Sequence, residues 1–152
     1  MSLTLFRVIR SFFFLEEEPK VEETPLETAV ALKNRGNRNF KVGRYAKAVE
    51  CYTAALEQCP ATAIEERATF YQNRAAAREN LGEITAAVED CTAALELLPT
   101  YLKALSRRAR LLETLHEKNE PGSENENYLT RCLYDITACC LLERLQNGVS
   151  LQ

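Results

Sequence analysis

The feature that most constrains the fold of this chain is an internal repeat. Residues 46–60 (AKAVECYTAALEQCP) align with residues 85–99 (TAAVEDCTAALELLP), an offset of 85 − 46 = 39 residues. Within both segments, small and apolar residues recur every three or four positions, which is typical of amphipathic helices. Each segment ends at a proline, Pro60 or Pro99, where a helix must stop. A looser copy at 131–143 (RCLYDITACCLLE) indicates that helical repeats continue toward the end of the chain.

The repeat unit is predicted to be two antiparallel helices joined by a tight turn. Gly43 and Gly82 mark two of these turns, because glycine is favoured just after the end of a helix. The offset equals the 34-residue tetratricopeptide period plus about five inserted residues. We therefore predict an all-α fold, a right-handed superhelix of three tetratricopeptide helix-turn-helix repeats. The first helices are expected near 26–42, 65–81 and 101–116, and the second helices near 45–58, 84–98 and 128–145.

The domain organisation follows from the same pattern. Residues 1–25 form an apolar N-terminal stretch plus an acidic linker, and residues 26–152 form the three-repeat domain. The repeats are expected at about 26–60, 65–99 and 101–147. A polar, turn-forming segment, 117–127 (EKNEPGSENEN), is predicted to be a loop inserted into the third repeat.

The N-terminal stretch 3–15 (LTLFRVIRSFFFL) is apolar but carries Arg7 and Arg10. As a helix it would rise only about 20 Å, short of the roughly 30 Å hydrocarbon core, so we do not expect a transmembrane segment. Two interpretations stay open. The stretch could contact a membrane interface, since it is basic and aromatic, or it could be an apolar tail that covers an exposed helix face.

Composition excludes several classes of function. With a net charge of −3, the chain lacks the excess of basic residues that general nucleic-acid binders carry, so no nucleic-acid partner is expected. The six cysteines include no CxxC pair or zinc spacing, and His116 is the single histidine, so we expect no metal, no cofactor and no catalytic residues. Cys139 and Cys140 lie in an apolar helical run, where buried thiols are usually inert. We predict reduced thiols and a protein that is not an enzyme.

Small residues mark where the paired helices approach closely: Gly36, Ala75 and Ala109 on the first helices, and Ala48, Ala55, Ala87 and Ala94 on the second. At about 100° per residue, a separate stripe of polar residues lies about 130° from this packing face of the first helices. The stripe consists of Lys33, Asn37, Asn73, Lys103 and Arg107. Three cations and two amides on one groove suit a ligand that bears carboxylates, held by charge-assisted hydrogen bonds.

At these residues the chain resembles a known family. The pattern KNRGNRNF … YQNRAAA … KALSRRA is similar to the carboxylate-clamp tetratricopeptide domains. That resemblance implies binding of the C-terminal Glu-Glu-Val-Asp tails of the seventy- and ninety-kilodalton heat-shock chaperones. The clamp positions of the family correspond here to Lys33, Asn37, Asn73, Lys103 and Arg107. Phe40 and Ala76 match positions that contact the apolar part of the tail.

Within this family the greatest resemblance is to the seventy-kilodalton import receptors of the mitochondrial outer membrane. It rests on CYTAALEQCP, TFYQNRAAARENLG, EDCTAALELLPTYLKALSRRA and LYDITACCLLERLQN. The resemblance implies a chaperone-docking adaptor in mitochondrial protein import, on the cytosolic face of the outer membrane, with other import-receptor subunits as candidate partners. Membrane anchoring and precursor binding do not carry over, because the receptors place them in a membrane span and a C-terminal domain that the resemblance does not reach. A cytoplasmic co-chaperone that uses the same clamp elsewhere is the alternative.

The last predicted helix, 128–145, poses a separate question. It has an apolar face, formed by Leu133, Ile136, Cys140 and Leu141, with no following helix expected to cover it. Repeat arrays normally need a polar element at their ends. We expect this face to be covered by the N-terminal stretch, by self-association or by a partner, or else the domain to be marginally stable.

Overall fold

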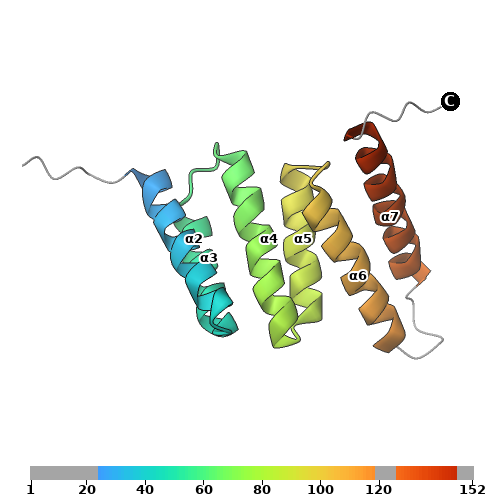
Figure 1. The fold of residues 1–152 in the computed structure, drawn as a ribbon, viewed down its shortest axis with the longest axis horizontal. Helices are drawn as coiled ribbons and strands as arrows, with labels where there is room; N and C mark the ends of the chain where they lie inside the picture. Colours follow the sequence, from blue (N-terminus) through green and yellow to red (C-terminus); the bar gives the residue numbers. More distant parts are fainter. Residues whose placement is uncertain (1–23, 119–125, 147–152) are drawn as a thin grey trace, which may run out of the picture.

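The computed structural model describes residues 24–118 and 126–146 of the 152-residue chain, and this part contains six helices and no strand. Figure 1 shows them side by side in chain order. Each predicted helix is present, and each of its ends lies within two residues of the expected bound. The helices are α2 (Pro25–Lys41), α3 (Tyr45–Gln58), α4 (Ile64–Leu81), α5 (Ile84–Leu97), α6 (Leu102–Lys118) and α7 (Glu126–Gln146).

The predicted loop 117–127 requires a correction at both of its ends. Glu117 and Lys118 continue α6, and Glu126 and Asn127 already belong to α7. Glutamate and lysine are good helix formers, so the helix continues until the sequence turns to asparagine, proline and glycine. The middle of the predicted loop, 119–125, lies outside the described residues, as do the N-terminal stretch 3–15 and most of the linker before α2.

The helices pack as three hairpins that stack in one row. The hairpins are α2 with α3, α4 with α5, and α6 with α7, and they are joined by contacts of α3 with α4 and of α5 with α6. In Figure 1, α2, α4 and α6 lie toward the viewer, while α3 and α5 lie behind them. The first helices of the repeats therefore share one face of the molecule, as the stripe of polar residues requires.

Local signals explain where the helices begin and end. The side chain of Thr24 accepts a hydrogen bond from the backbone N–H of Glu27, and the Glu27 carboxylate accepts one from the backbone N–H of Thr24. This reciprocal cap satisfies two backbone donors at the start of α2. Gly43 and Gly82 adopt φ values of 75° and 81°, the left-handed conformation that ends α2 and α4 and allows the tight turn inside each hairpin.

The core consists mostly of small residues, as predicted. Gly36, Ala75 and Ala109 are buried on the first helices, and Ala48, Ala55, Ala87 and Ala94 are buried on the second helices. Larger side chains fill the remaining space between them, chiefly Tyr52, Phe70, Leu111 and Leu112. The close approach of paired helices fixes the spacing of α2, α4 and α6, and so it positions the groove that they line.

Within residues 24–118 and 126–146, none of the helices combines the length and the apolar character that crossing a bilayer demands.

Candidate functional site: a groove of amides and cations

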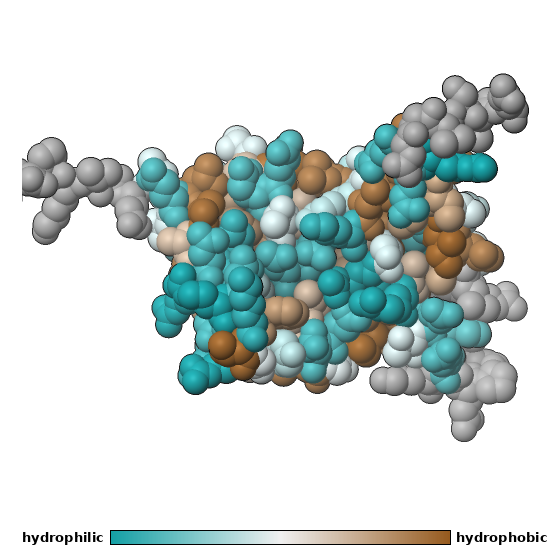
Figure 2. Space-filling view, in the orientation of Figure 1, coloured by the Kyte–Doolittle hydropathy of each residue, from teal (hydrophilic) through white to brown (hydrophobic). Residues whose placement is uncertain are grey.

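Two hollows lie on the face formed by the first helices. One has a volume of about 200 Å³ and is lined by Asn37, Phe40, Lys41, Tyr52, Asn73 and Ala76. It brings together four of the seven predicted site residues, from α2 and α4. In Figure 2 the surface over α2, α4 and α6 is largely hydrophilic, while hydrophobic side chains gather toward the α7 end.

The two amides of the first hollow are linked directly. The Nδ2 of Asn73 donates to the Oδ1 of Asn37 at 3.5 Å, and the hydroxyl of Tyr52 donates to the same oxygen at 2.7 Å. With its oxygen bonded twice, Asn37 keeps the two donors of its NH₂ group, which find no acceptor among the described residues and suit a ligand. The hollow therefore offers amide donors, which suit a carboxylate.

Tyr52 holds this arrangement in place from the neighbouring helix α3. Tyr52 is 2% exposed, and its ring packs against α2 at Gly36. Burial raises the pKa of Tyr52 to about 12, so the phenol stays protonated and remains a donor at neutral pH. The apolar side of the hollow is formed by Ala76 and by Phe40, whose ring meets Tyr45 edge-on with centroids 5.3 Å apart.

A second hollow, of about 340 Å³, lies beside the first, on the side of α6. Its lining consists of Gln72, Leu102, Lys103, Ser106, Arg107, Arg110 and Glu143. Lys103 and Arg107 are one turn apart on α6 and both face this hollow, as their spacing predicted. Lys103 is exposed and Arg107 is half-buried. Lys33, half-buried on α2 one turn before Asn37, lines neither of these two hollows.

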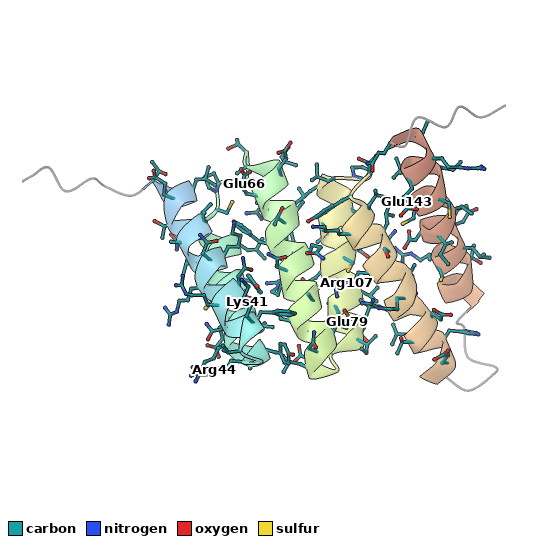
Figure 3. The ribbon with its side chains drawn as sticks, in the orientation of Figure 1. Lys41, Arg44, Glu66, Glu79, Arg107 and Glu143 are labelled. Carbon is teal, nitrogen blue, oxygen red and sulfur yellow. The ribbon has the colours of Figure 1, made fainter. Side chains whose placement is uncertain are left out.

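The cations of the second hollow are partly neutralised by an acidic residue that sequence reasoning missed. Glu79 on α4 accepts a hydrogen bond from Arg107 Nη1 through one carboxylate oxygen. Its other oxygen accepts from Arg110 Nη2 at 2.6 Å. Figure 3 shows Glu79 and Arg107 side by side between α4 and α6. Glu79 lies seven residues after Gln72, hence on the same face of α4, which is the signal that could have found it.

Arg110 and Tyr52 also belong to the site, although the sequence did not predict them there. Arg110 follows Arg107 by three residues and therefore lies on the same side of α6. Tyr52 belongs to a second helix, whose residues were assigned to packing alone, yet its hydroxyl reaches the groove. Only the structure shows that a ring from α3 passes beside Gly36 to reach Asn37.

The paired cysteines of the last helix are not among the residues that line the two hollows of this groove. Cys139 is half-buried, and burial raises the pKa of its thiol, which lowers its nucleophilicity at neutral pH. Cys140, which the apolar helical run predicted to be buried, is exposed on α7, so the prediction is wrong for this thiol. Both lie on the side of α7 that meets a different hollow, lined by Cys132, Ile136, Glu113 and other residues of α6 and α7.

Comparison with known proteins supports the repeat assignment. The tetratricopeptide-repeat family matches residues 29–62 and again residues 68–101. The mitochondrial import receptor subunit TOM70 of Rattus norvegicus is 45% identical over 131 residues, which is 86% of this chain and 20% of the rat protein. The human TOM70 is 46% identical over 126 residues, 83% of this chain and 19% of the human protein. The chain thus spans about one fifth of the length of these relatives.

Solved structures show the same architecture. The second tetratricopeptide domain of Spaghetti (RPAP3), bound to the HSP90 peptide SRMEEVD, superposes with a TM-score of 0.63 at 30% identity. That comparison covers 79% of this chain and 96% of the other. The Arabidopsis OM64 tetratricopeptide domain gives a TM-score of 0.64 at 29% identity, over 78% of this chain and 85% of the other. The predicted fold class, a right-handed all-α superhelix of helix-turn-helix repeats, is confirmed, and the chain belongs to the tetratricopeptide-repeat family.

Proposed function

We propose that this chain is a docking module for the acidic C-terminal tails of heat-shock chaperones of the seventy- and ninety-kilodalton classes, and not an enzyme. One observation carries the proposal: the amides of Asn37 and Asn73 meet at one hollow, and the cations Lys103 and Arg107 line the next. A peptide that ends in a free carboxylate and carries acidic side chains complements both hollows. The similarity to a domain bound to the HSP90 peptide SRMEEVD supports the same ligand class.

The roles divide between the two ends of the groove. Lys33, Asn37 and Asn73 hold the terminal carboxylate, and Lys103 and Arg107 hold a side-chain carboxylate and the backbone of the preceding residues. Phe40 and Ala76 contact the apolar residue between them. This division follows the family resemblance, and the amide donors of the first hollow fit it because hydrogen bonds to a charged acceptor are the strong ones.

Binding is expected to be micromolar, about −8 kcal/mol. A short flexible peptide loses conformational freedom on binding and buries little area, which limits its affinity. The affinity should fall as salt rises, because the groove is open to solvent and its charges are screened.

The test is a calorimetric titration with Glu-Glu-Val-Asp peptides that end either in a free acid or in an amide. Amidation removes one anion from a site of donors, and we expect it to weaken binding by at least about 1.5–3 kcal/mol. Arg107→Ala should cost a similar amount, whereas Arg38→Ala, which removes an exposed arginine elsewhere on α2, should leave affinity unchanged. Equal affinity for the two peptides would show that the five predicted residues are a solvated surface.

The cellular setting proposed for this module is mitochondrial import, on the cytosolic face of the outer membrane. The observation in favour is the 45–46% identity to TOM70 proteins over most of this chain. Fractionation of cells that express the full protein, with protease treatment of intact mitochondria, tests it. Recovery in the cytosolic fraction alone would favour the alternative of a cytoplasmic co-chaperone.

A further inference from the structure

We propose that Glu79 is an internal competitor for the clamp arginine: its carboxylate binds Arg107, and an acidic peptide must displace it to engage the groove. The inference rests on the function proposed above and deepens it. It names the residue that sets how much negative charge a ligand must bring.

Glu79 occupies the guanidinium that the proposed function assigns to a ligand carboxylate. It reaches from α4 across to α6, and its two oxygens accept from Arg107 and Arg110 separately. The side chains of Glu79 and Arg107 are 21% and 20% exposed, so the pair is reachable from the groove but partly shielded from water.

Arg107 is bonded incompletely in this arrangement. Glu79 engages one terminal nitrogen, and the Nε of Arg107 is buried with no acceptor among the described residues. An arginine meets a carboxylate best through two parallel hydrogen bonds. Because the Nε is buried, a peptide carboxylate makes the two-bond pairing only once Glu79 is displaced and the guanidinium turns toward the groove.

Arg110 makes the exchange possible without leaving Glu79 unpaired. Its Nη2 already holds the second carboxylate oxygen at 2.6 Å, and its side chain is 61% exposed, so it can follow the carboxylate as it moves. Displacement therefore costs one ion pair and leaves no charge buried alone.

A competitor at Arg107 also affects which ligands bind. A ligand with a single carboxylate would gain little binding free energy by replacing Glu79 at Arg107, whereas a ligand with several carboxylates would bind both hollows. Glu79 thus selects for multiply acidic tails.

The experiment is a calorimetric titration of the free-acid Glu-Glu-Val-Asp peptide into the wild-type chain and two variants, Glu79→Gln and Glu79→Ala. We expect both variants to bind about fivefold more tightly, the size of a partly exposed ion pair. Glu89→Gln removes the same charge from an exposed site on α5 and is the matched control, with affinity unchanged within twofold. In an Arg107→Ala background the gain from Glu79→Gln should be largely lost, because the two residues act as a pair.

The outcomes separate this inference from the proposed function. If wild type binds free-acid and amidated peptides alike, the docking function itself fails. If wild type discriminates between them but both Glu79 variants bind equally well or more weakly, docking stands and the competitor role is overturned. Weaker binding would show that Glu79 positions Arg107 for the ligand. Thermal melts of each variant verify that the fold is retained before affinities are compared.

Discussion

At the scale of single residues, the groove depends on Gly36, because a glycine leaves room for the Tyr52 ring against α2. A Cβ built at Gly36 would lie 2.6 Å from Cε1 and 2.8 Å from Cδ1 of Tyr52, closer than atoms in contact can be. The glycine lets the Tyr52 ring pass against α2, and the hydroxyl then reaches Asn37. The sequence predicted that Gly36 sits at a close approach of helices, because the repeat places small residues there. It could not predict which ring fills the space, since that depends on the rotation of α3.

Gly36→Ala tests this dependence. Forcing a methyl group into a filled site should destabilise the chain by about 1–3 kcal/mol in urea unfolding. The displaced ring should also weaken peptide binding. Asn34→Ala, an exposed change two residues earlier on the same helix, is the control and should shift stability by no more than about 0.5 kcal/mol. If Gly36→Ala matched that control, the packing of Tyr52 against α2 would not exist in solution.

At the scale of elements, buried arginine–aspartate pairs hold the hairpins together. Asp90 on α5 is 3% exposed and accepts hydrogen bonds from Arg74 and Arg78 on α4. Arg74 also donates to Thr53 on α3, so one guanidinium joins three helices. The next repeat has a corresponding network without a counterpart of Arg78, in which Arg108 binds Asp135 and Thr92.

The sequence predicts the helices that carry this network but not its ion pairs. The alignment places Asp90 and Asp135 in one register, and the helices themselves were predictable from their period and from the prolines and glycines that end them. The partners were not predictable, because an arginine on a helix surface is usually solvated and nothing in the spacing distinguishes Arg74 from an exposed one. In the first repeat the aligned residues are Arg35 and Cys51, and there Arg35 is exposed.

Asp90→Asn should therefore lower the free energy of unfolding strongly, although asparagine has nearly the same shape as aspartate. Removing the charge leaves two half-buried arginines facing a neutral amide, and breaking a buried pair costs about 3–5 kcal/mol. The measurement is the free energy of unfolding in urea. Glu89→Gln makes the same change of charge and shape at the adjacent exposed position and should have an effect of about 0.5 kcal/mol or less. Similar values for the two variants would show that the network contributes nothing to stability.

At the scale of the whole molecule, the last described helix, α7, exposes an apolar face. In α5, Val88, Cys91 and Leu95 pack against α6. The residues in the same register of α7 are Leu133, Ile136 and Cys140, which are exposed, the first two by 63% and 47%. The outer face of α7 departs from the repeat as well: Tyr134 and Leu141 stand where α5 has Glu89 and Glu96, and they are 70% and 48% exposed. The uncovered apolar face predicted for the last helix is thus present in the described part of the chain.

Ile136 and its counterpart Cys91 occupy the same register but differ in burial, so their substitution should differ in cost. Ile136→Gln removes a side chain that is already about half exposed, so it should cost the isolated chain about 1 kcal/mol or less. Cys91→Gln places an unpaired amide in a fully buried site and should cost well over about 2 kcal/mol. Both values come from urea unfolding at a concentration where sedimentation shows a monomer. At higher concentration Ile136→Gln should reduce any self-association of the wild type. A cost for Ile136→Gln as large as that for Cys91→Gln would mean that residues beyond the described ones cover this face. Deletion of residues 1–20 would then identify the N-terminal stretch as the cover if it lowered the melting temperature by the same amount.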